Sequence, residues 1–214
     1  MPRQNRVLPT GDIVALPFRG GMFGNRGVLH DAAGRIRRPW QVKRWICCVL
    51  SFKGRHRPIM RPGHYTELFF ADEASAFAAG HRPCAECRRA DYERFRDAWV
   101  AAFGGPRPSA GAMDDALHQA RIDPATRGQR RFAAKASDLP DGVFILDAEE
   151  RPALYVDGRV RPQLTHEPQD EARETSDTWS YIPAVAVDRD DELVVLTPEP
   201  ILRVLAAGYR PAMD

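Results

Sequence analysis

Short runs of apolar residues, separated by segments rich in glycine, proline and charge, dominate the first third of this chain. Runs of four to eight apolar, β-branched or aromatic residues bounded by turn residues are typical of strands. The runs that fit this description are 13–18, 43–52 and 65–70. We expect 43–52 to be buried, because its centre is wholly apolar. Residues 26–30 and 35–37 predict a hairpin, whereas the glycines between 20 and 24 predict a turn or loop.

A helical pattern replaces the strand pattern after residue 71. Asp72 is a suitable N-cap for a helix over 73–79, which ends at Gly80 because glycine tolerates the left-handed conformation that follows a helix. A second helix opens with the cysteines after Pro83, and its apolar residues recur at spacings of three, four and four. These residues, which we expect to face the core, are Tyr92, Phe95, Trp99 and Phe103.

A loop rich in glycine and proline at 104–109 separates a basic, β-rich unit (1–104) from a second unit (105–214). The loop is short enough for the two units to pack as one globule. The elements predicted for the second unit are a helix at 114–122, a β-meander over 143–160 with a turn at Asp157-Gly158, strands at 182–187 and 193–196, and a helix from Thr197-Pro198 to Gly208. We therefore expect an α+β protein with short antiparallel hairpins, a meander, a zinc-knuckle and helix element, and a C-terminal helix.

The composition is that of a globular protein. Hydrophobic residues make up 43% of the 214 residues and charged residues 28%, which is ordinary for a folded domain. No apolar run reaches the length of about 18 residues that a membrane helix needs, and no segment near the N-terminus suits a signal peptide. We therefore expect a cytoplasmic protein, in which the four cysteines stay reduced and able to bind a metal.

The net charge of +2 hides a strong asymmetry. Residues 1–61 contain 13 Lys or Arg and two acidic residues, so this segment carries +11 and the rest of the chain carries −9. A basic face suits a polyanion such as nucleic acid, although an arginine-rich solvated surface has the same composition. The residues that we expect to contact phosphates are Arg35, Arg37, Arg38, Lys43, Arg44, Lys53, Arg55 and Arg57.

The most informative motif is Cys84-Ala85-Glu86-Cys87. Two cysteines three positions apart can face one ion, and zinc sites are commonly built from such a pair closed by two further Cys or His ligands. The remaining cysteines are Cys47 and Cys48. Adjacent residues of a strand point to opposite faces, so only one of these two should reach the ion. The alternative is a set of buried free cysteines that pack as small apolar side chains.

Residues 69–87 read FFADEASAFAAGHRPCAEC. This segment resembles the zinc-binding domain of the Ada DNA-repair methyltransferase family, which has an aromatic strand end, a short alanine-rich helix, Ala-Gly-[Tyr/Phe]-Arg-Pro-Cys and a second cysteine after two residues. The resemblance covers about residues 65–90. It implies that Cys84 and Cys87 bind zinc in a small module that commonly meets nucleic acid.

The chain departs from that family upstream of the cysteine pair. The family carries its other two ligands, and its methyl-accepting chemistry, on a Cys-x3-Cys segment that this chain lacks, so the repair function is not carried over. We expect one of Cys47 and Cys48 to complete the site together with His56, with His64 and His81 as alternatives. A structural role is favoured for His81, because the family has an aromatic residue at its position.

Three functions are compatible with these patterns. The first is a zinc-containing, nucleic-acid-binding protein that is not an enzyme and in which the zinc is structural. The second is a metal-dependent enzyme acting on nucleic acid or a phosphorylated substrate, with acid–base groups among His30, His56 and His64, although no phosphate-binding loop or hydrolase motif supports it. The third is a structural zinc protein that binds a protein partner or a second copy of itself through the acidic segment 165–192.

Overall fold

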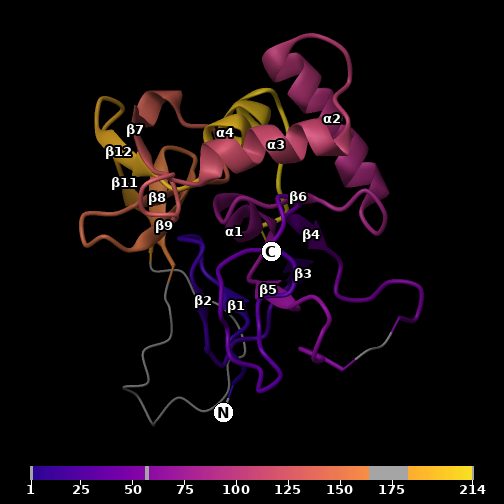
Figure 1. Ribbon diagram of the computed structural model, residues 1–214. Helices are drawn as coiled ribbons and strands as arrows, with labels where there is room; N and C mark the ends of the chain where they lie inside the picture. The colour runs from indigo at the N-terminus through magenta and orange to yellow at the C-terminus, as the bar shows by residue number, and fades with distance from the viewer. Residues whose placement is uncertain (1, 56–57, 164–182, 214) are drawn as a thin grey trace.

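The structure, a computed structural model, describes residues 2–55, 58–163 and 183–213. Over these residues the chain forms four α-helices and two six-stranded sheets, which confirms the α+β class and the C-terminal helix (Figure 1). The described helices include none that is both long enough and apolar enough to span a bilayer.

The first sheet is built from the N-terminal third of the chain in the order β2-β1-β5-β3-β4-β6. Its strands are β1 (Arg6–Val7), β2 (Ile13–Val14), β3 (Met22–Asn25), β4 (Ile46–Cys48), β5 (Leu68–Phe70) and β6 (Arg82–Pro83). The strand β3 pairs antiparallel with both β4 and β5, whereas β6 adds to β4 in parallel. The ladders are shorter than the apolar runs 13–18, 43–52 and 65–70 that predicted them. The hairpin predicted over 26–37 is reduced to one bridge between His30 and Ile36.

The prediction of a loop at the first glycines was wrong for Gly24, which lies inside β3 between two partner strands. A Cβ atom at this position would lie 2.3 Å from the carbonyl oxygen of Ile46 and 2.8 Å from the ring of Phe70. Gly24 is therefore needed because the neighbouring strand approaches closely, not because the chain turns there.

The helix α1 (Glu73–Ala78) lies between the two sheets (Figure 1). The Asp72 carboxylate accepts a hydrogen bond from the N–H of Ser75 at 2.7 Å, and Gly80 has a φ of +83°, so both predicted ends of this helix are confirmed. Every residue of α1 is buried, because its faces pack on β5 on one side and on β8 on the other.

The second sheet has the order β11-β10-β9-β8-β12-β7 and contains the predicted meander. Its strands are β7 (Phe132–Lys135), β8 (Val143–Leu146), β9 (Pro152–Val156), β10 (Arg159–Pro162), β11 (Val185–Ala186) and β12 (Glu192–Val195). Asp157 and Gly158 have φ values of +52° and +69°, as expected for the predicted two-residue hairpin turn.

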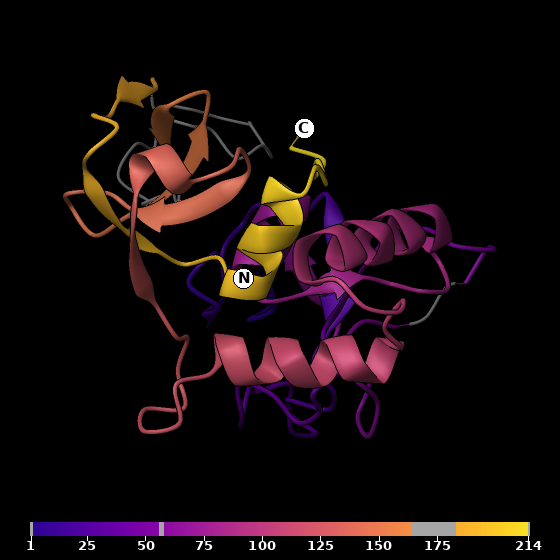
Figure 2. The ribbon, with the colours of Figure 1, turned by 90° about the horizontal axis from the view of Figure 1, so that it is seen from above.

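The largest core joins this sheet to the helices α2 (Arg89–Phe103), α3 (Ala110–Arg121) and α4 (Glu199–Ala206). Seen from above, α4 lies between the second sheet and α2 (Figure 2). In the predicted stripe of α2, Phe95 and Trp99 are buried, whereas Phe103 is 38% exposed at the end of the helix.

Candidate metal centre

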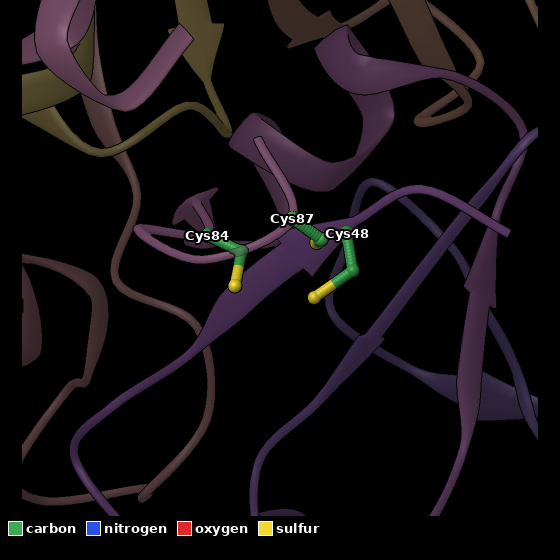
Figure 3. Close-up of side chains that lie close together, drawn as sticks. All are labelled: Cys48, Cys84 and Cys87. Atoms are coloured by element: carbon green, nitrogen blue, oxygen red, sulfur yellow. The ribbon is translucent and has the colours of Figure 1, made fainter. Parts of the chain in front are cut away.

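The pairing of β4 with β6 brings two distant cysteines together. In this parallel pair Cys47 lies opposite Pro83, so the next residues along the two strands are Cys48 and Cys84. The N–H of Cys84 donates to the carbonyl of Cys47 at 2.9 Å and extends the ladder by one bond. A turn then returns the chain so that Cys87 faces the same point (Figure 3).

The sulfur atoms of Cys48, Cys84 and Cys87 all lie within 4.8 Å of one another. A tetrahedral zinc ion with Zn–S bonds of about 2.3 Å holds its sulfurs about 3.8 Å apart. A small contraction of the cluster therefore matches the spacing that zinc requires. Cys48 and Cys84 are buried and Cys87 is partly exposed.

The surroundings of the cluster favour a thiolate at Cys84, whereas the pKa values of Cys48 and Cys87 are raised. The N–H of Glu86 donates to the sulfur of Cys84 at 3.4 Å. Hydrogen bonds from the thiols of Cys48 and Cys87 lower the pKa of Cys84, and the same sharing raises the pKa of Cys48, which donates its proton. A divalent ion placed between the sulfurs would displace the shared protons, since metal-bound thiols ionise outright.

Cys47 lies on the opposite face of β4 and takes no part in the cluster. Its side chain is fully buried among Val7, Leu68 and other core residues. Its sulfur accepts a hydrogen bond from Arg88 at 3.0 Å, and burial raises the pKa of its thiol. Adjacent residues of a strand point to opposite faces, so the side chain of Cys47 lies away from that of Cys48.

His64 and His81, the alternatives to His56 as a metal ligand, lie apart from the three clustered sulfurs. His81 is fully buried between Trp45 and Phe70, where desolvation lowers its pKa. His64 lies at the surface beside Arg61. Neither belongs to the group of side chains close enough to share an ion with Cys84.

The remaining predicted histidines are placed differently. His56 lies outside the described residues, and its role as a ligand stays a prediction. His30 is buried, and its Nδ1 lies 2.6 Å from the hydroxyl of Thr66, a contact that fixes the ring inside the first sheet region. His30 is therefore not one of the side chains grouped with Cys84.

Four of the predicted phosphate-binding residues form ion pairs with carboxylates. Arg35 and Arg37 both contact Asp31, at 3.1 and 2.7 Å. Two further pairs join segments distant in sequence: Lys43 with Asp115 at 2.8 Å and Arg55 with Glu86 at 2.6 Å. The exposed residues of the set that form no ion pair with a described residue are Arg38, Arg44 and Lys53. Arg57 lies outside the described residues.

The three clustered cysteines border a cavity of about 560 Å³ over the first sheet. The other residues of its wall that matter here are Arg6, Arg19, Phe23, Asn25, Glu67 and Phe69. The sequence patterns gave none of these residues a role at the site, because they come from separate segments that only the folded sheet brings together.

Comparison with known protein families, with curated proteins and with solved structures finds no match to this chain. The resemblance of residues 65–90 to the Ada zinc-binding domain stays a prediction.

Proposed function

We propose that this chain is a zinc protein whose metal, held by Cys48, Cys84 and Cys87, faces a ligand-binding cavity. The observation that carries the proposal is the cluster of three sulfurs within 4.8 Å of one another on the wall of a cavity of about 560 Å³. Soft thiolate ligands at this spacing select zinc among the common divalent ions.

Three protein ligands with the fourth position directed at a cavity are typical of catalytic zinc sites, whereas structural sites are closed by four. This arrangement favours a metal-dependent enzyme over a purely structural clip. When bound, zinc polarises a ligand oxygen or activates a water molecule. The chain's own part is to hold the sulfurs: the N–H of Glu86 stabilises the thiolate of Cys84, and the Arg55–Glu86 ion pair ties the turn to the segment after β4.

The adjacent cysteines of β4 provide a matched test. Elemental analysis of the purified wild-type protein should give one zinc per chain. Cys48→Ala and Cys84→Ala should lose that zinc, whereas Cys47→Ala should keep it, because its side chain lies in the core on the other face of the strand. Circular dichroism of each variant reports whether it is folded. A folded Cys47→Ala protein that loses zinc as completely as Cys48→Ala would overturn this ligand set.

Cobalt replacement then tests whether the fourth position is accessible. The visible absorption of the cobalt-loaded protein should change when a small ligand such as azide or imidazole is added, because the ligand enters the coordination sphere. An unchanged spectrum in wild type that becomes responsive in His56→Ala would mean that His56 closes the site, and that the zinc is structural.

Nucleic acid is a second candidate partner, favoured by the exposed Arg38, Arg44 and Lys53, which no described carboxylate neutralises. Binding through these residues would release counterions and weaken as salt rises. A gel-shift titration with single- and double-stranded DNA and RNA at about 50 and 200 mM salt tests it. An interaction with another protein, predicted for 165–192, rests on a segment whose residues 165–182 lie outside the described chain.

A further inference from the structure

The open face of the first sheet presents a row of four side chains that ends at the metal centre. Arg6 of β1 pairs with Phe69 of β5, Phe69 with Phe23 of β3, and Phe23 with Cys48 of β4. Residues in register point to the same face. The row therefore has a cation at one end, two aromatic rings in the middle and the metal-binding sulfur at the other end.

The opposite face of the same strands is closed by core packing. Val7, Cys47 and Leu68, each adjacent to a member of the row, are fully buried against α1 and its neighbours. The row itself borders the cavity of about 560 Å³. Cavities of roughly 300–1,000 Å³ lined by aromatic and apolar side chains with a few polar groups are typical of small-molecule sites.

The charges in this cavity are unbalanced at the Arg6 end. The guanidinium of Arg6 donates from Nε to the carbonyl of Phe18 at 2.7 Å and lies 5.1 Å from the centre of the Phe69 ring. Neither Arg6 nor the exposed Arg19 lies within ion-pair distance of a carboxylate in the described part of the chain. Burial lowers the pKa of Arg6, because it removes water from the charged guanidinium. An anion that donates no proton and accepts hydrogen bonds from this guanidinium would replace the lost water.

The remaining polar groups of the cavity suit the edge of a nitrogen heterocycle. Glu67 is buried, and its Oε2 accepts a hydrogen bond from the N–H of Met60 at 2.6 Å. Its Oε1 has no partner among the described residues, and an unpaired buried acceptor is destabilising. The amide of Asn25 lies on the neighbouring strand. Both side chains can accept the N–H groups of a base.

We propose that this cavity binds a nucleotide, free or as one unit of a single strand, with the base on Phe23 and Phe69 and the phosphate at Arg6 and Arg19. This inference rests on the proposed function in that the zinc centre forms the far end of the site. Aromatic rings stack favourably on any nucleic-acid base, and guanidinium groups match phosphate oxygens well. The substrate class of the proposed enzyme is then a phosphorylated compound carrying a nitrogen heterocycle.

Calorimetric titration of the zinc-loaded protein with GMP, guanosine and ribose 5-phosphate tests the two halves of the site. The titrations extend to a ligand concentration of about 1 mM. GMP should bind more tightly than guanosine or ribose 5-phosphate. Arg19→Ala should weaken GMP binding about threefold to tenfold and leave guanosine binding unchanged, because Arg19 contacts only the phosphate and is exposed, so that folding is preserved. Arg159→Ala, an exposed arginine of β10 away from the cavity, is the control and should bind GMP as wild type does.

A short single strand in place of GMP distinguishes the two sources of the ligand. Tighter binding of a four-nucleotide strand than of GMP assigns the site to single-stranded nucleic acid, and tighter binding of GMP assigns it to a free nucleotide. Zinc content is measured on the same samples. It tests the zinc proposal independently of the nucleotide titrations. A zinc-loaded wild-type protein that binds neither GMP nor the strand would overturn the nucleotide proposal and leave the zinc proposal standing. Equal loss of GMP and guanosine affinity in Arg19→Ala would also overturn it.

Discussion

Single residues acquire different roles here according to the face on which they lie. Cys47 and Cys48 are chemically identical neighbours, yet one sulfur contacts Arg88 in the core and the other joins the cluster with Cys84. The rule of strand alternation was sufficient to predict that only one of the two would lie with Cys84 and Cys87. Which one could not be predicted, because the sequence does not show which face of β4 packs on the core.

His81 gives a residue-scale prediction on pH. Its folded pKa lies well below the ordinary 6.5, because burial and the nearby cations of Arg26 and Arg121 disfavour the charged ring. Below pH 6.5 the unfolded chain therefore binds a proton that the folded chain does not. This contribution to stability is complete above that pH and is lost as the pH falls below it.

The unfolding free energy should thus drop by about 1.4 kcal/mol more in wild type than in His81→Phe between pH 7.5 and pH 5.5. Urea unfolding of both proteins at the two pH values measures the difference. The comparison concerns the change with pH, so any constant cost of the larger ring cancels. Equal pH dependence in the two proteins would show that His81 is not buried in its neutral form.

Elements of secondary structure place the site through close strand contacts. The strand β3 pairs with both β4 and β5 at Gly24. The register of the short β6 on β4 places Cys84 beside Cys48. The sequence predicted β4, β5 and α1 from their apolar runs and caps. It did not predict β3, whose glycine is typical of a loop, or the two-residue β6, whose Arg-Pro sequence has no strand pattern.

Gly24→Ala is the corresponding test. The added Cβ would lie 2.3 Å from the Ile46 carbonyl, so β4 would have to move away from β3. We expect a loss of about 1–3 kcal/mol in unfolding free energy, by overpacking, and weaker zinc binding because Cys48 moves with β4. Urea unfolding and competition with a zinc chelator measure the two effects.

Gly111→Ala in α3 is a matched control. The nearest atom to its added Cβ is the Ser109 hydroxyl at 3.9 Å, so no strand contact is disturbed. It should stabilise the protein by at most about 0.5–1 kcal/mol, the value for a helix interior, because Gly111 lies in the first turn, with zinc affinity unchanged. If Gly24→Ala behaved like Gly111→Ala, the close approach of β4 to β3 would not position the metal ligand.

At the scale of the whole molecule, ion pairs redistribute the charge that the sequence concentrates in residues 1–61. The +11 of this segment is partly neutralised by carboxylates from other parts of the chain, such as Asp115 of α3 with Lys43 and Glu86 of the cysteine turn with Arg55. The segment therefore presents fewer free cations than its composition suggests.

This neutralisation limits the salt dependence of nucleic-acid binding. The three predicted residues that are exposed and unpaired, Arg38, Arg44 and Lys53, would release about three counterions. The slope of log K against log salt should then lie near −2 to −3 for the contacts of this surface. Arg44→Ala should reduce its magnitude by about one, whereas Lys43→Ala, which removes a cation already paired with Asp115, should leave it nearly unchanged. Equal effects of the two substitutions would exclude this surface as the phosphate-binding face.

Local patterns in the sequence are sufficient to predict the α+β class, both ends of α1, the Asp157-Gly158 turn and the cysteine pair as a candidate metal site. These features depend on local chemistry: caps, left-handed glycines and the periodicity of apolar residues. Only the folded chain shows that Cys48 joins Cys84 and Cys87, that three carboxylates pair with four of the predicted phosphate-binding residues, and that Arg6, Phe69 and Phe23 form a row leading to the cysteine cluster. These features depend on which strands pair and in which register, and pairing between distant segments is set by packing of the whole sheet, not by any local pattern.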